Sequence, residues 1–156
     1  VVTFSNNDGE VQLPFDQKSG KYSFEGVVRV DSLLTKEKLY TKARQWFSTA
    51  FRSAQDVLQM DDRDAGILVG KGNFLANLPM VGPQYSRVDF TITVRVKDGR
   101  YKYTITDFSS YYGPLENKRK HRWVKSIYSQ TQGEILSLIE SLNEAMRNVP
   151  VEDDDW

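Results

Sequence analysis

The sequence of 156 residues contains no cysteine and only one histidine, His121. The lack of cysteine excludes disulfide bonds, thiolate catalysis, and the iron–sulfur and zinc centres that need sulfur ligands. No hydrophobic run approaches the roughly 18 residues that a membrane helix requires. The 21 Lys and Arg residues balance the 21 Asp and Glu residues. The chain as a whole is therefore not attracted to nucleic acid or to a membrane surface, and any such attraction must be local.

What the chain does contain is enough apolar material for one core, with 39% hydrophobic and 27% charged residues. These values are typical of a single globular domain of this length. We predict one domain over residues 21–150, an irregular lead-in over residues 1–20 and an acidic tail over residues 151–156. Because the chain begins at Val1 rather than at a methionine, we expect a native start, with any signal segment, to lie upstream.

Alternating apolar and polar residues predict strands at residues 21–30 and 88–96. Asp98-Gly99 then forms the dipeptide that is most typical of a two-residue hairpin loop. With that loop, the paired residues would be Val96 and Tyr101, Val94 and Tyr103, and Ile92 and Ile105. A second hairpin is predicted from residues 56–60 and 67–74, around a polar loop that ends at Gly66.

Apolar residues occur at helical spacing in two segments of the sequence. Thr35 is placed to cap a first helix of about five turns, and its apolar stripe consists of Leu39, Ala43, Trp46, Phe47, Ala50, Phe51 and Ala54. Thr131 and Glu134 form a capping box for a second helix, which Pro150 ends. We interpret residues 109–130 as a long connection with one short strand at residues 123–128.

The order is therefore strand, helix, four strands in two hairpins, helix. This order predicts an α+β fold in which a curved antiparallel sheet of about five strands carries two helices on one face. The other face would be polar, with Thr91, Thr93, Arg95, Lys102, Thr104 and Thr106 on it. Such a face is typical of a solvated sheet, although an open sheet is also a surface that a partner can use.

Several stretches carry a family resemblance: Leu13-Pro14-Phe15-Asp16, residues 21–30, residues 42–47, and DVLQMDDRDAGILVGKG from Asp56 to Gly72. Together they resemble a bacterial domain of unknown function with a TATA-binding-protein-like (TBP-like) fold, common in the Bacteroides group. The resemblance implies that fold and a periplasmic, outer-membrane-anchored or secreted location. It implies no catalytic residues, and a TBP-like fold is no warrant for DNA binding because function belongs to sites rather than to folds.

Three motifs come close to a catalytic or metal site without completing one. Residues 65–72 nearly match a phosphate loop, but Gly72 stands where a Ser or Thr would bind magnesium. Asp61, Asp62 and Asp64 lack the Glu that closes a calcium loop, so we interpret them as turn-stabilising residues. His121 lies in a cationic run that disfavours its protonated form. We therefore predict no metal, no cofactor and no catalytic residue.

Two groups of residues are candidates for binding. Lys118, Arg119, Lys120 and Arg122 would attract a polyanion in a salt-dependent manner. Tyr85, Tyr111, Tyr112 and Trp123 would line a ligand pocket if their loops converge. We expect a non-catalytic module of the bacterial cell envelope that binds an unidentified protein or small molecule, with nucleic acid disfavoured. Two alternatives stay open: a polyanion-binding module that uses the basic loop 118–125, and a hydrolase of unknown specificity.

Overall fold

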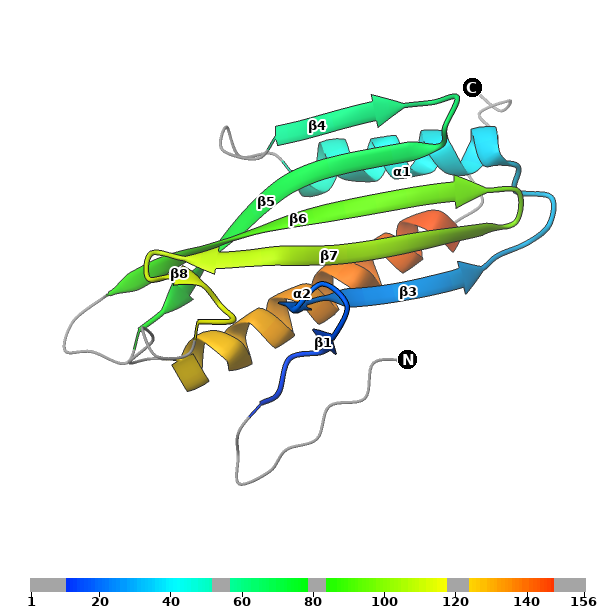
Figure 1. Cartoon of the computed structure of the whole chain (residues 1–156). Helices are drawn as coiled ribbons and strands as arrows, with labels where there is room; N and C mark the ends of the chain where they lie inside the picture. The colour runs from blue at the N-terminus through cyan, green and yellow to red at the C-terminus, as the bar shows by residue number, and fades with distance from the viewer. Residues whose placement is uncertain (1–10, 52–56, 79–83, 118–123, 148–156) are drawn as a thin grey trace.

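The computed structural model describes residues 11–51, 57–78, 84–117 and 124–147. Within them, the main sheet has the strand order β3-β7-β6-β5-β4, all neighbours are antiparallel, and the short β8 pairs with β7. In chain order the elements are β1 (Phe15–Asp16), β2 (Lys21–Tyr22), β3 (Phe24–Arg29), α1 (Lys36–Ala50), β4 (Val57–Asp62), β5 (Ile67–Asn77), β6 (Tyr85–Lys97), β7 (Arg100–Ser110), β8 (Gly113–Pro114) and α2 (Val124–Arg147). Figure 1 shows both helices behind the long strands. The predicted α+β arrangement, with two helices on one face of an antiparallel sheet, is thus confirmed.

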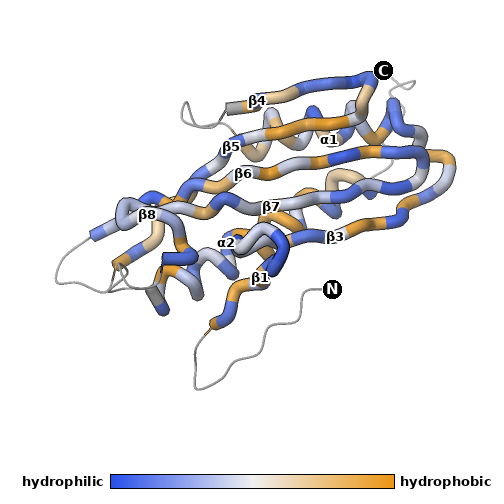
Figure 2. The backbone as a smooth tube through the Cα atoms, in the orientation of Figure 1, coloured by the Kyte–Doolittle hydropathy of each residue, from blue (hydrophilic) through white to orange (hydrophobic). Residues whose placement is uncertain are grey.

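The β6–β7 hairpin turns at Asp98-Gly99, as its sequence predicts. Gly99 has a φ of 71°, a left-handed conformation that costs glycine little. The three predicted pairs, Val96 with Tyr101, Val94 with Tyr103 and Ile92 with Ile105, all form. Their side chains are buried while the intervening residues are more exposed. Figure 2 shows the same alternation of hydrophobic and hydrophilic residues along both strands.

Helix α1 begins where its cap is predicted, because the Thr35 hydroxyl accepts from the backbone N–H of Lys38 at 3.3 Å. The Asp98 side chain, from the hairpin turn, accepts from the backbone N–H of Lys36 at 2.7 Å. Both oxygens satisfy donors that the first turn of a helix leaves open. Lys42 of this helix is buried, and that burial lowers its pKa.

The second helix differs from its prediction. The expected short strand at residues 123–128 is wrong over its described part, because α2 already spans Val124–Arg147. Thr131 is not a cap; it lies inside the helix, where its hydroxyl donates to the carbonyl oxygen of Ile127 at 2.7 Å. The β-branched and aromatic residues of this segment favour a strand locally. Burial of Ile127, Tyr128 and Ile135 along one helix face outweighs that preference.

The β4–β5 hairpin is also confirmed, with Gly66 in its turn at a φ of 69°. The register of β4 shifts between Leu58 and Met60, opposite Gly70 and Val69, which marks a bulge. Residues 65–72 are therefore turn and strand rather than a phosphate loop that leads into a helix. A Cβ atom on Gly72 would lie 2.4 Å from Cε1 of Phe51, so this glycine permits the end of α1 to approach the sheet.

The described part of the N-terminal segment packs on the domain. β1 and β2 form a separate two-stranded sheet, and Leu13 is buried in the core together with Tyr22 and Phe24. The hydroxyl of Tyr128, on α2, contacts the hydroxyl of Tyr22 at 3.1 Å and also donates to the carbonyl oxygen of Leu115. These contacts tie the N-terminal hairpin to the second helix.

Candidate functional site

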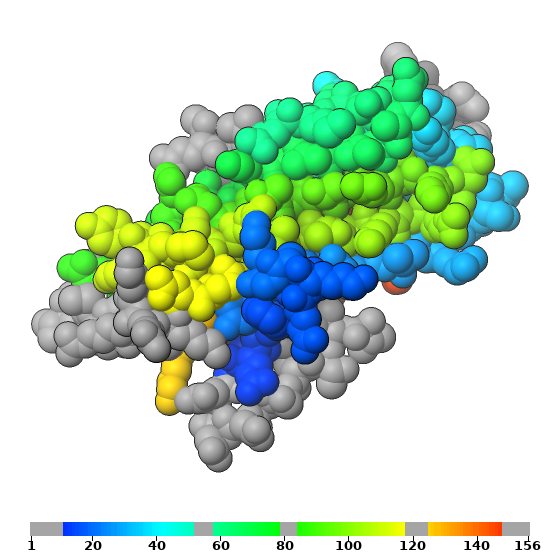
Figure 3. All heavy atoms as spheres, in the orientation of Figure 1, coloured from blue at the N-terminus to red at the C-terminus, as the bar shows by residue number. Residues whose placement is uncertain are grey.

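Neither helix covers the sheet face that is turned toward the viewer in Figure 1. In the space-filling view of this face, the atoms of β5, β6 and β7 lie between β4 on one side and the N-terminal hairpin on the other (Figure 3). The six residues predicted for this face are partly or fully exposed: Thr91, Thr93, Arg95, Lys102, Thr104 and Thr106. We call this surface the open face.

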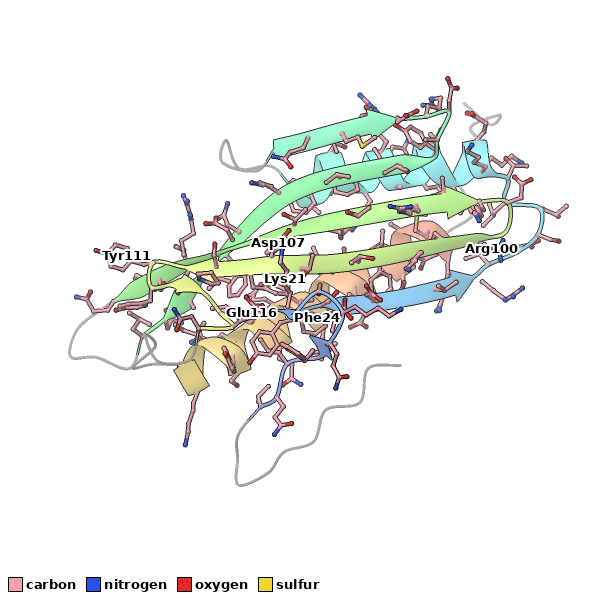
Figure 4. All side chains as sticks on the ribbon, viewed as in Figure 1. Lys21, Phe24, Arg100, Asp107, Tyr111 and Glu116 are labelled. Atoms are coloured by element: carbon pink, nitrogen blue, oxygen red, sulfur yellow. The ribbon has the colours of Figure 1, made fainter. Side chains whose placement is uncertain are left out.

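Cations gather at the hairpin end of the open face because of the strand register. Arg95 lies directly opposite Lys102, and Lys97 lies directly opposite Arg100. On the other side of β7, Arg29 of the edge strand β3 pairs with Arg100. Figure 4 shows Arg100 at this end of the sheet. Three adjacent strands thus place five positive side chains in two neighbouring cross-strand rows.

Four of these cations line a hollow of about 570 Å³, which we call the basic hollow. Its lining residues are Val27, Thr93, Arg95, Lys97, Arg100, Tyr101, Lys102 and Thr104. None of them is acidic. Within the described part of the chain, neither these four cations nor Arg29 forms an ion pair. Asp98, the acid in the adjoining turn, instead caps helix α1.

A second hollow, of about 700 Å³, lies further along the open face and carries both signs of charge. Lys21, Lys71 and Arg87 line it together with the acids Asp89, Asp107 and Glu116, so we call it the mixed hollow. Lys21 forms an ion pair with Asp107, and this contact raises the pKa of the lysine. A carboxylate oxygen of Glu116 accepts from the backbone N–H of Tyr22 at 2.8 Å. Figure 4 shows Lys21, Asp107 and Glu116 close to one another near the middle of β7.

A bulge in β7 lies in the wall of the mixed hollow. The register between β6 and β7 shifts between Asp89 and Thr91, and Asp107 adopts a positive φ of 57°. As a result Asp107 is exposed, while the next residue, Phe108, is buried with its ring 6.2 Å from that of Phe90. Bulges of this kind redirect side chains and are frequent beside binding and active sites.

Two tyrosines with a raised pKa form contacts inside the domain. Burial raises the pKa of Tyr101 to about 12, and its hydroxyl contacts Oδ1 of Asn143 on α2. Burial also raises the pKa of Tyr128, which bonds to Tyr22 and Leu115 inside the domain. Among the residues that the structure describes, no three His, Cys, Asp or Glu side chains cluster in a way that could hold a metal ion.

Comparison with known proteins shows which family this chain belongs to. The family described as "Domain of unknown function (DUF4468) with TBP-like fold" matches residues 24–111, which run from β3 through β7. The chain belongs to this family. The predicted TBP-like fold and the predicted family resemblance are thereby confirmed.

Two solved structures are similar in fold to this chain. One is a TBP-like protein from Parabacteroides distasonis, with a TM-score of 0.74 and 12% identity, over 87% of this chain and 97% of that one. The other is a DUF4468 family protein from Bacteroides ovatus, with a TM-score of 0.68 and 14% identity, over 95% of this chain and 92% of that one. Identities this low show the fold alone. No curated protein matches the sequence.

Three of the predicted aromatic residues, Tyr85, Tyr111 and Tyr112, are not among the residues that line either hollow. Tyr85 begins β6, whereas Tyr111 and Tyr112 follow β7, with their rings edge-to-face and 5.4 Å apart. Tyr85 and Tyr111 are exposed, and Figure 4 shows Tyr111 at the end of the sheet opposite to Arg100. Trp123 lies outside the described residues, so its proximity to the three tyrosines is not defined.

The predicted basic loop also falls outside the described residues. Lys118, Arg119, Lys120 and Arg122 all lie in residues 118–123, as does His121. The aspartates predicted to stabilise a turn are described: Asp62 accepts from the backbone N–H of Ala65 at 3.0 Å, and Asp61 pairs with Arg44 of α1. Across the described segments, no helix is both long and apolar enough to cross a membrane.

The basic hollow was missed by sequence reasoning, although part of its signal was present. The Asp98-Gly99 loop already fixes Arg95 opposite Lys102 and Lys97 opposite Arg100. We considered Arg95 and Lys102 only as members of a polar face. The pairing of β3 with β7, which adds Arg29, joins strands far apart in the sequence and has no local signature.

Proposed function

We propose that this domain is a non-catalytic binding module that holds a small molecule or a protein partner on the open face of its sheet. The observation that carries the proposal is the pair of hollows on the face that neither helix covers. Pockets of this size accommodate typical small ligands. The envelope location also remains our proposal; it comes from the family resemblance and is tested by cell fractionation of a strain that expresses the native gene.

A thermal-shift panel followed by amide mapping tests the binding surface. The panel comprises oligosaccharides, fatty acids, cell-wall fragments, nucleotides and oligophosphates at low and moderate salt. A ligand present at 100 times its dissociation constant stabilises the folded state by about 2.7 kcal/mol, which is easily detected. We then expect the hit to shift backbone amide resonances of open-face residues such as Thr93, Thr104 and Thr106. Shifts confined to the exposed sides of α1 and α2 would contradict the proposal.

The alternative function, a hydrolase, requires different residues on the same face. It requires carboxylates in a hollow, and the described candidates are Asp89, Asp107 and Glu116 of the mixed hollow. If the purified domain turns over a substrate and Asp89→Asn, Asp107→Asn or Glu116→Gln abolishes the turnover, the hydrolase replaces the binding module. The polyanion alternative through the basic loop 118–125 predicts that neutralising Lys118, Arg119, Lys120 and Arg122 removes binding while open-face variants do not.

A further inference from the structure

The basic hollow is electrostatically unfavourable for the folded domain. Like charges placed directly opposite each other on antiparallel strands destabilise a sheet, and this site contains two such pairs side by side, Arg95 with Lys102 and Lys97 with Arg100. Elsewhere the domain combines opposite charges, as in the ion pair between Arg63 and Glu37 at 2.9 Å. A face that was only solvated sheet would gain stability by the same mixing. The unbalanced cluster therefore points to an anion that is bound from solution.

The size of the cluster restricts what that anion can be. The five cations lie on three adjacent strands, with two on β6, two on β7 and one on β3. Standard sheet spacings give this area dimensions of about 10 Å by 7 Å. Neutralising five charges there takes five carboxylates but only about three phosphate monoester groups, because each such group carries about −1.5 to −2 at neutral pH. High charge density in a small volume thus favours phosphate.

We propose that the basic hollow binds a compact oligophosphate, meaning a small molecule with two or more phosphoryl groups close together. This inference rests on the proposed function of the open face and specifies its ligand class. Arg95 and Arg100 supply planar guanidinium groups that bind phosphate oxygens in pairs, and Arg29 adds a third beside them. Lys97 and Lys102 act as point charges. Thr93 and Thr104, which are paired across β6 and β7 and line the hollow, have hydroxyl groups that can donate hydrogen bonds.

A nucleic-acid strand fits the site less well. It carries one negative charge per phosphate and spreads these charges along the chain, so the short patch faces only a few of them. An acidic peptide likewise presents one charge per carboxylate. We therefore expect inorganic tripolyphosphate to bind more tightly than single-stranded DNA or polyglutamate when the three are compared at equal total negative charge.

The test is isothermal titration calorimetry of the whole chain with inorganic tripolyphosphate at low ionic strength. The decisive variant is Arg95→Gln/Lys102→Gln, which removes one like-charge pair from the hollow. The matched control, Lys18→Gln/Lys38→Gln, removes the same number of charges from the turn between β1 and β2 and from α1, away from both hollows. We expect the first variant to weaken tripolyphosphate binding by about tenfold or more, a change of about 1.4 kcal/mol, and the control to change it little. Equal effects of the two variants would overturn the proposal.

Amide mapping separates failure of this inference from failure of the proposed function. If tripolyphosphate binds and shifts amides around Arg95 and Lys102, both stand. If it does not bind, or if DNA or polyglutamate binds more tightly, the oligophosphate assignment falls; the binding module survives if another ligand maps to the open face. If tripolyphosphate and every other hit of the panel map elsewhere on the domain, both proposals fall.

Discussion

Gly26 lies directly opposite Tyr103 across β3 and β7, beneath the end of the tyrosine ring. A Cβ atom at residue 26 would lie 2.5 Å from Cζ of Tyr103, closer than real Cβ atoms approach a neighbour. A large ring that covers a glycine on the adjacent strand is a recurrent way to shield an edge strand. The absence of a side chain at residue 26 is therefore a packing requirement of this sheet.

We predict that Gly26→Ala destabilises the domain. The new methyl group forces the buried Tyr103 ring to move, and overpacking of this kind costs about 1–3 kcal/mol. Chemical denaturation of wild type and variant measures the free energy of unfolding. A variant as stable as wild type would show that the ring moves freely and that Gly26 is not constrained.

Gly133 provides the opposite case and a separate prediction. It lies within α2, and nothing is found within 4 Å of the position that its Cβ atom would take. Because alanine is a better helix former than glycine, Gly133→Ala should stabilise the domain by about 1 kcal/mol. The same denaturation experiment measures it, and destabilisation would indicate a contact on this helix face that the described residues do not include.

The like-charge pairs predict that Arg95→Gln/Lys102→Gln is more stable than wild type in the absence of ligand. Cross-strand pairs are worth about 0.2–1 kcal/mol, so the gain should be of that size at low ionic strength. At 1 M salt, where the screening length falls to about 3 Å, the gain should shrink. Melting temperatures of wild type, this variant and the control Lys18→Gln/Lys38→Gln at two salt concentrations check it. A loss of stability would mean that the two cations stabilise the sheet.

We predict that the folded domain loses stability at alkaline pH because of Tyr101. Burial raises its folded-state pKa from 10.0 to about 12. The stabilisation of the neutral form is complete below pH 10 and is lost as the pH rises through 12, since the unfolded state releases this proton first. For one proton that the folded state retains and the unfolded state has released, the free energy of unfolding falls by about 1.4 kcal/mol per pH unit in that window. Unfolding measured between pH 9 and 12 should show a shallower decline for Tyr101→Phe, whereas Tyr111→Phe, at an exposed residue, should follow wild type.

We predict an unusual order of stability for two substitutions of Asp107. Its φ of 57° is unfavourable for residues with a branched Cβ and costs glycine little. Asp107→Gly loses the exposed ion pair with Lys21, which contributes little to stability, and gains a comparably small amount from the relaxed backbone. We expect it to match wild-type stability, and Asp107→Val to be less stable by about 2 kcal/mol. If the valine variant unfolds at the same denaturant concentration as wild type, the bulge is not fixed by residue 107.

Local signals in the sequence were enough for most of the fold. The alternation around Val94 and the Asp98-Gly99 loop fixed a hairpin and its register, and Thr35 fixed the start of α1. The beginning of α2 was mispredicted because residues such as Ile127 and Tyr128 favour a strand unless the core that buries them is known.

The candidate site was less accessible from the sequence because it depends on non-local contacts. The bulge leaves only a weak trace, a break in alternation between Ile105 and Phe108. The contribution of Arg29 to the basic cluster requires the partner of β3 to be known. The sequence shows that Lys97 and Arg100 are positively charged. That they belong to one cationic surface follows only when both cross-strand rows are placed on the same face of the sheet.

The position of Tyr103 between two strands has a consequence for how the chain folds. Tyr103 pairs on one side with Val94, a neighbour along the same hairpin, and on the other side with Gly26, from near the start of the chain. Closing the hairpin restricts a short loop, whereas docking β3 restricts a loop that contains α1 and three strands, so its entropic cost is higher. We therefore expect the β6–β7 hairpin to form early and the N-terminal strand to join it late. The cationic rows would then be completed in one of the last steps of folding.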